Sequence, residues 1–141
     1  MESLNAPDLP EGALLLVDSA PIIYVLEGHD RLAARFAPLF ARHAAGELVL
    51  AVTPITVAEV LTGPLRAGEE ALARRYRGVL ESWQVIDFTS EMAEAAARLR
   101  GKYGLKLPDA IQAASALSIN AHALVTHDRD FTGIRGLRVL G

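Results

Sequence analysis

Four acidic residues stand out because each follows an apolar stretch or lies close to the expected start of a helix. They are Asp18, Glu59, Asp109 and Asp128. In an α/β sheet, strand ends and the helix starts that follow them meet at one crevice. Carboxylates gathered there repel one another, and a divalent cation relieves the repulsion. The four residues therefore predict metal-assisted chemistry on phosphate esters.

Taken singly, three of these acids also have a purely structural interpretation. Asp18 is placed to cap the helix after it, Asp109 to face a helix dipole in a first turn, and Asp128 to sit in a turn. Glu59 differs, because it is expected in the middle of a helix between Val57 and Val60. An unpaired carboxylate in an apolar setting costs several kcal/mol. Together the four fall where an α/β sheet places a ligand site, which favours the functional interpretation.

The elements that must position these acids alternate along the chain. Apolar runs predict strands at 13–17, 48–52, 83–88, 123–126 and 137–140. Helical periodicity and capping residues predict helices at 19–26, 30–45, 54–63, 69–82, 90–101 and from 108 onward. The alternation predicts an α/β fold with a mostly parallel sheet of four to five strands flanked by helices. Residues 1–12 are expected to be a loosely ordered leader, and residues 13–141 a single domain.

Composition limits the possible classes of function. Of the 141 residues, 51% are hydrophobic and none is cysteine, which predicts a real core and excludes thiolate sites and a cysteine nucleophile. The formal net charge of −3 argues against strong non-specific binding to nucleic acid. No apolar run has the length of a membrane span, and no secretory signal is recognisable at the start. We therefore expect no membrane association and a cytoplasmic location.

Motifs of several other enzyme classes are absent from the sequence. There is no Gly-x-Ser-x-Gly for an α/β-hydrolase and no phosphate-binding Gly-x-x-x-x-Gly-Lys. Asp18 is not part of an Asp-x-Asp pair, which argues against an aspartyl-phosphate phosphatase. The four histidines have no zinc-like spacing. His127 neighbours the site and is either a substrate contact or, in the favoured interpretation, a surface loop residue.

Four segments together resemble the PIN-domain ribonucleases, and specifically the toxins of VapBC-type toxin–antitoxin pairs. They are residues 17–19 with the two isoleucines at 22–23, residues 59–63 (Glu-x-x-x-Gly), residues 105–114 and residues 126–131. The resemblance extends from about residue 14 to residue 140. One position departs from the family pattern, because Ala20 stands where a hydroxyl or amide side chain is frequent.

The resemblance implies a PIN-like domain that cleaves RNA endonucleolytically with Mg²⁺ or Mn²⁺. Asp18, Asp109 and Asp128 are then the expected metal ligands, and Glu59 completes the metal shell or positions the attacking water. Ser19 and Thr126 are candidates to support the ligands, and Asp130 is a weaker candidate ligand. The implied partners are an RNA substrate, a separate antitoxin chain and a second copy in a homodimer.

Two other functions remain open at this stage. One is a catalytically silent PIN fold that acts only as a binding module. The other is a different Mg²⁺-dependent phosphoester hydrolase. A receiver domain is disfavoured, because it needs a paired acid at the end of the first strand and Asp18 is followed by Ser19.

Overall fold

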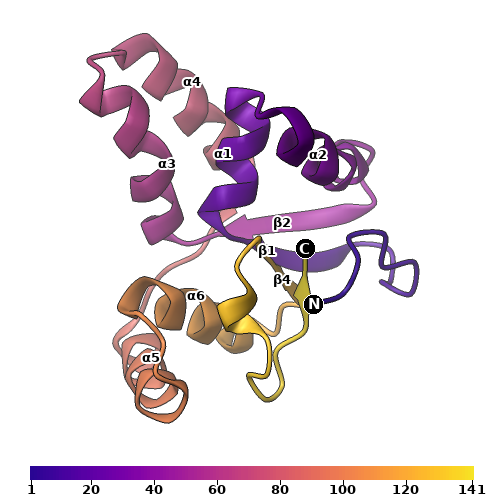
Figure 1. Cartoon of the computed structure of the whole chain (residues 1–141), viewed down its shortest axis with the longest axis vertical. Coiled ribbons are helices and arrows are strands. Elements are labelled where there is room, and N and C mark those ends of the chain that lie inside the picture. The colour runs from indigo at the N-terminus through magenta and orange to yellow at the C-terminus, as the bar shows by residue number, and fades with distance from the viewer.

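The computed structural model describes residues 1–141 as three layers, with one parallel sheet between two groups of helices (Figure 1). The sheet has five strands in the order β3-β2-β1-β4-β5, and every neighbouring pair is parallel. The strands are β1 (Ala13–Val17), β2 (Leu48–Val52), β3 (Gln84–Val85), β4 (Ala123–Val125) and β5 (Val139–Leu140). The predicted α/β class and parallel sheet are confirmed, and β3 is shorter than the predicted strand at 83–88.

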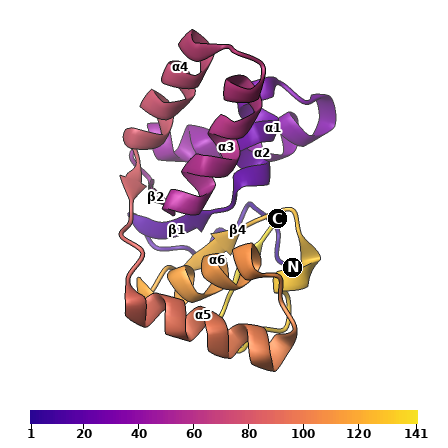
Figure 2. The same cartoon turned by 90° about the vertical axis from the view of Figure 1, so that its left-hand side faces the viewer.

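Six helices cover the two faces of the sheet. They are α1 (Ser19–Glu27), α2 (Asp30–Ala44), α3 (Pro54–Arg66), α4 (Glu70–Glu81), α5 (Ser90–Tyr103) and α6 (Leu107–Ser118). Figures 1 and 2 show α1 to α4 on one side of the sheet, and α5 with α6 on the other. No helix is both long enough and apolar enough to cross a membrane.

The core lies on both faces of the sheet, which explains the uninterrupted apolar runs of the central strands. Leu15 and Val17 of β1 pack into the cluster beneath α1 to α4. Leu16, between them, packs into the second cluster with α5 and α6. Strands buried on both sides cannot slip in register without moving apolar side chains, so the ends of β1 and β4 are held firmly.

Side-chain caps fix where several helices begin. Asp18 accepts a hydrogen bond from the backbone N–H of Ser19 at the start of α1. Thr53 accepts from the N–H of Thr56 at the start of α3, as its position before Pro54 predicted. These caps set the exit direction of the chain at the carboxyl ends of β1 and β2, where the candidate site lies.

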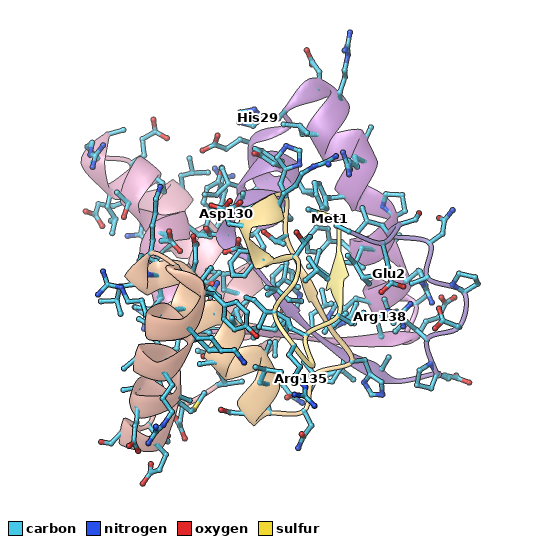
Figure 3. All side chains as sticks on the ribbon, turned by 60° about the horizontal axis from the view of Figure 1, so that its bottom comes forward. Met1, Glu2, His29, Asp130, Arg135 and Arg138 are labelled. Atoms are coloured by element: carbon cyan, nitrogen blue, oxygen red, sulfur yellow. The ribbon has the colours of Figure 1, made fainter.

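The first twelve residues pack against the domain, whereas the sequence led us to expect a loosely ordered leader. Glu2 forms an isolated bridge with Leu140, and the Arg138 guanidinium contacts the carboxylates of Glu2 and Asp8, each at 2.9 Å. Leu9 is almost fully buried. Figure 3 shows Met1, Glu2 and Arg138 on the same part of the molecule. The prolines and glycine of this segment prevent a regular element but do not prevent packing.

Candidate metal site at the end of the central strands

The acidic residues gather where the direction of chain connection changes. From β1 the chain continues through α1 and α2 on one face, whereas β4 is reached through α5 and α6 on the other. The crevice at such a switch point is the usual ligand site of an open α/β sheet. Asp18 follows β1 and Thr126 follows the adjacent β4. The Asp18 N–H donates to the carbonyl oxygen of Val125 at 2.8 Å, so the two strand ends are joined directly.

Three donors hold the Asp18 carboxylate in one orientation. Its Oδ1 accepts from the Ser19 N–H at 2.9 Å and from Gln112 Nε2 at 3.1 Å. Its Oδ2 accepts from the Thr126 hydroxyl at 2.8 Å. Asp18 is 9% exposed, and both Ser19 and Thr126 are buried. The structure thus assigns Asp18 two roles, since it caps α1 and presents a fixed, nearly buried charge at the crevice.

Gln112 of α6 is part of this arrangement, although the sequence did not lead us to include it among the site residues. It is 1% exposed and links both sides of the sheet. Its Nε2 donates to Thr56 Oγ1 at 2.7 Å as well as to Asp18, and its Oε1 accepts from Thr53 Oγ1 at 2.8 Å. Its position one helical turn after Asp109 is the only signal in the sequence that could have indicated this role.

Asp128 is connected to Asp18 through a shared hydroxyl. Thr126 Oγ1, which donates to Asp18, also accepts from the backbone N–H of Asp128 at 3.0 Å. Asp128 Oδ1 in turn accepts from the N–H of Asp130 at 2.8 Å, at the start of the 3₁₀ helix η1 (Arg129–Phe131). The turn interpretation of Asp128 is therefore correct, and it does not conflict with a place in the acidic group.

The tightest acidic group consists of Asp109, Asp128 and Asp130. One carboxylate oxygen from each lies within 4.8 Å of the others. Asp130 therefore belongs to the tightest group, although the sequence indicated it only as a weaker candidate ligand. Asp18 and Glu59 adjoin this group without being part of it. Figure 3 shows Asp130 on η1, near the upper end of the strands in that view.

The charges of these residues act on one another. Burial, followed by the charges of Asp128, Asp18 and Asp130, raises the pKa of the Asp109 carboxyl to about 6, although Lys106 acts in the opposite direction. This mutual repulsion means that the carboxylates lie close enough to influence one another's ionisation. A bound cation would stabilise the ionised form of Asp109, which the metal-free protein disfavours.

Glu59 belongs to the same field from the α3 side of the crevice. Burial raises the pKa of its carboxyl, the charges of Asp18 and Asp109 raise it further, and a hydrogen bond with Ser19 lowers it. The residue as a whole is exposed, as is Ala58 before it. The expected apolar environment is therefore found only in part, because Val60 is buried in the core whereas Glu59 lies at the surface of α3 with its carboxyl partly desolvated.

The donor set fits a hard divalent cation. Asp109, Asp128 and Asp130 supply only oxygen atoms, which are the ligands that Mg²⁺ and Mn²⁺ prefer. No cysteine exists in the chain. The close carboxylates would compensate the charge of such an ion, and the ion would relieve the repulsion that raises the Asp109 pKa.

Comparisons with known proteins agree with this geometry. The family model described as PIN domain matches residues 15–137. A chain in a toxin–antitoxin complex from Klebsiella pneumoniae is 31% identical, with a TM-score of 0.68 and coverage of 87% of this chain and 94% of that one. A comparison with curated proteins finds no match.

Two more distant structures share the fold. VapC20 from Mycobacterium tuberculosis, a sarcin–ricin loop cleaving toxin, is 17% identical with a TM-score of 0.69, over 83% of this chain and 92% of that one. VapBC-1 from nontypeable Haemophilus influenzae is 23% identical with a TM-score of 0.69, over 89% of this chain and 96% of that one.

Proposed function

Because the chain belongs to the PIN domain family, we propose that it is a metal-dependent endoribonuclease and the toxin of a toxin–antitoxin pair. One observation carries the proposal. Asp109, Asp128 and Asp130 meet within 4.8 Å at the switch point of the sheet, directly beside the fixed carboxylate of Asp18. This oxygen-rich arrangement suits a hard divalent cation of the kind that assists hydrolysis of phosphodiesters.

Asp18, Asp109 and Asp128 are the proposed ligands of Mg²⁺ or Mn²⁺, with Asp130 as a further one. When bound, the ion would lower the pKa of a water molecule and stabilise the charge that develops on the phosphate. Gln112 and Thr126 keep Asp18 in place, so the carboxylate is already ordered in the folded protein before an ion binds. Ser19 supports both Asp18 and Glu59.

Glu59 is the proposed acceptor of the proton from the attacking water. Its raised pKa makes it a stronger base than an ordinary surface glutamate, and it faces the crevice opposite the Asp109 group. Attack by water on the phosphorus would leave a 5′-phosphate and a 3′-hydroxyl, as the family resemblance implies. In the alternative role, Glu59 completes the metal shell.

The proposed antitoxin has to recognise two features of this surface. The acidic crevice suits an arginine, whose planar guanidinium matches carboxylates in a bidentate manner. On the face covered by α1 to α4, the side chains of Ile22, Val25, Leu26, Phe40, Val79 and Trp83 line an apolar cavity of about 110 Å³. An amphipathic segment could fill the cavity and cover the acids together. The Klebsiella pneumoniae relative comes from a toxin–antitoxin complex, which supports such a partner.

The proposed homodimer needs an apolar surface that remains after the core is formed. Four apolar residues of the first two helices could contribute to it, namely Ile22, Ile23, Phe36 and Phe40. Ile22 and Phe36 are 1% and 0% exposed and belong to the core. Ile23 and Phe40 are only partly buried. They remain the candidates among the four for contact with a second copy. With RNA as its substrate, the protein would act in the cytoplasm.

Cleavage of labelled RNA tests the proposal directly. The purified wild-type protein should cleave single-stranded RNA with Mg²⁺ or Mn²⁺ and stop when EDTA is added. Asp109→Asn should lose this activity while its circular dichroism spectrum stays unchanged. Glu91→Gln, which changes an exposed carboxylate in the first turn of α5, is the matched control and should remain active.

The same experiment separates the other candidate functions. A fully active Asp109→Asn protein would contradict the assigned site. RNA binding without cleavage at any metal concentration would favour the silent binding module. Cleavage of a small phosphoester but not of RNA would favour a different hydrolase. Growth arrest on expression of the wild type alone, relieved by a co-expressed partner, tests the toxin role.

A further inference from the structure

A group of aromatic rings lies immediately beside the acidic crevice and has no part in the proposed chemistry. It contains Tyr24 of α1, His29 after it, Phe36 of α2 and His127. The ring centroids of Tyr24 and His127 are 5.6 Å apart, those of Phe36 and His127 6.1 Å, and those of Tyr24 and Phe36 6.2 Å. His29 joins through Tyr24 at 5.4 Å. Figure 3 shows His29 just beyond α1.

The position of His127 in the chain ties this ring group to the site. It stands between Thr126, which holds Asp18, and Asp128 of the acidic group. Adjacent Cα atoms are 3.8 Å apart, so the imidazole starts about 4 Å from the backbone of a proposed metal ligand. A base next to a phosphate bound at the acids would therefore be within reach of the His127 ring.

The His127 ring is packed against two aromatic rings and is still exposed to solvent. Tyr24 and Phe36 are nearly perpendicular to it, at 86° and 80°. The three centroid distances are nearly equal, so Tyr24 and Phe36 lie next to each other as seen from the imidazole. Phe36 is fully buried, whereas His127 is exposed. Contact with a buried ring limits the motion of the exposed one, which favours a preorganised platform.

A platform for stacking would compensate for the weak electrostatic attraction between this acidic protein and RNA. The chain carries a net charge of −3, and the crevice itself concentrates carboxylates, so phosphate attraction alone would bind RNA weakly. Stacking of a base on an aromatic ring does not depend on net charge. One local cation also lies at the ring group, because the Arg35 guanidinium is 5.8 Å from the Phe36 centroid.

We infer that His127, supported by Tyr24 and Phe36, stacks against an unpaired base next to the scissile phosphate of a single-stranded RNA. This inference rests on the proposed function and names the form of RNA that the site accepts. An unpaired base exposes its faces to a side chain, whereas a base inside a duplex is already stacked. If His127 stacks in this way, the site should prefer single-stranded segments to duplexes.

Binding of two matched RNA probes tests the inference. The first is a fluorescein-labelled single-stranded RNA ten nucleotides long, and the second has the same phosphates but abasic residues. Both are titrated in the Asp109→Asn background, so that the RNA stays intact. His127→Ala should weaken binding of the first probe about 5- to 100-fold and leave binding of the abasic probe unchanged. His127→Phe, which retains a flat ring, should restore most of the loss.

His122→Ala is the matched control, because His122 is also exposed and flanks the opposite end of β4. It should bind both probes as the background protein does. An equal effect of His127→Ala on both probes, or no preference of the background protein for the base-bearing probe, would overturn the stacking role. Thermal melting verifies that the exposed substitution leaves the fold intact.

Failure of this inference can be told apart from failure of the proposed function. If the wild type cleaves RNA but His127→Ala does not distinguish the two probes, stacking is refuted and the nuclease stands. If the wild type cleaves no RNA but the base-dependent difference at His127 is present, the platform stands and the nuclease proposal fails.

Discussion

Replacing Asp109 by asparagine should stabilise the metal-free protein, although it removes a residue of the proposed site. The wild-type carboxyl has a pKa of about 6 in the folded protein because of burial and the charges of Asp128, Asp18 and Asp130. In the unfolded chain it returns to an ordinary value near 3.8. Between these two pH values Asp109 is ionised in the unfolded chain but still largely protonated in the folded protein. The free energy of unfolding therefore falls as the pH rises from about 4 to about 6, and it stays lower above that range.

The magnitude follows from the size of the pKa difference. A rise from 3.8 to about 6 corresponds to at most about 3 kcal/mol, at about 1.36 kcal/mol per pKa unit. Asp109 is only partly buried, so solvent screening reduces this to about 1 kcal/mol. For a chain of 141 residues, that difference corresponds to a melting temperature about 3 °C higher for Asp109→Asn at pH 7.

Thermal melts in EDTA across pH 4 to 8 would measure the effect. The wild type should lose stability between about pH 4 and pH 6, and Asp109→Asn should lose less over the same range. Addition of Mg²⁺ or Mn²⁺ at pH 7 should raise the melting temperature of the wild type, because a ligand that binds only the folded state stabilises it. The same addition should have a much smaller effect on the variant.

Glu91→Gln is the control, since it removes one carboxylate from an exposed face of α5. It should retain the wild-type pH profile and the response to metal. An Asp109→Asn protein that is less stable than the wild type in EDTA at pH 7 would refute the reasoning, because repulsion within the acidic group would then not be the dominant effect. An unchanged metal response would refute the shared site.

Three further perturbations probe the supporting contacts. Gln112→Leu should lower the free energy of unfolding by about 2–3 kcal/mol in urea titrations, because it leaves buried hydroxyl and carboxylate partners unsatisfied, and a loss below about 0.5 kcal/mol would contradict the network. Thr126→Val should weaken Mn²⁺ binding about 10- to 100-fold in calorimetry, since Asp18 and the N–H of Asp128 both lose a partner, whereas Thr126→Ser should bind nearly as well as the wild type. Arg138→Gln should speed hydrogen exchange in residues 1–9 without affecting the central strands, and unchanged exchange would show that the ion pairs do not hold this segment.

Strand and helix positions followed closely from the sequence because local signals set them. The predicted strands at 13–17 and 48–52 coincide with β1 and β2. Thr53 and Thr89 cap α3 and α5 as expected. Apolar runs, capping residues and prolines act within a few residues, so they can be read without knowledge of the tertiary structure. The shortening of β3 could not be predicted, since it depends on which residues find a partner in β2.

The site was predictable only in its carboxylates. Asp18, Asp109 and Asp128 were found because acids after apolar runs are conspicuous in a sequence. Gln112 was missed because its function depends on long-range contacts, with a partner 94 positions away. The environment of Glu59 was predicted only in part, since the apolar residues beside it on α3 point elsewhere. Side-chain direction in the crevice is set by tertiary packing, which the sequence does not display.

The short segment at the start of the chain also bears on aggregation. Glu2 pairs with Leu140 and so covers the outer edge of β5, while the opposite edge of the sheet is formed by β3 with only two residues. An exposed strand edge is a template on which another chain can extend the sheet, and proteins avoid this with short or covered edges. Both edges of this sheet are blunted in that way. The proposed homodimer would then use helical surfaces and not a sheet edge. Removal of the first residues should expose β5 and promote fibrillar aggregation of an otherwise folded protein.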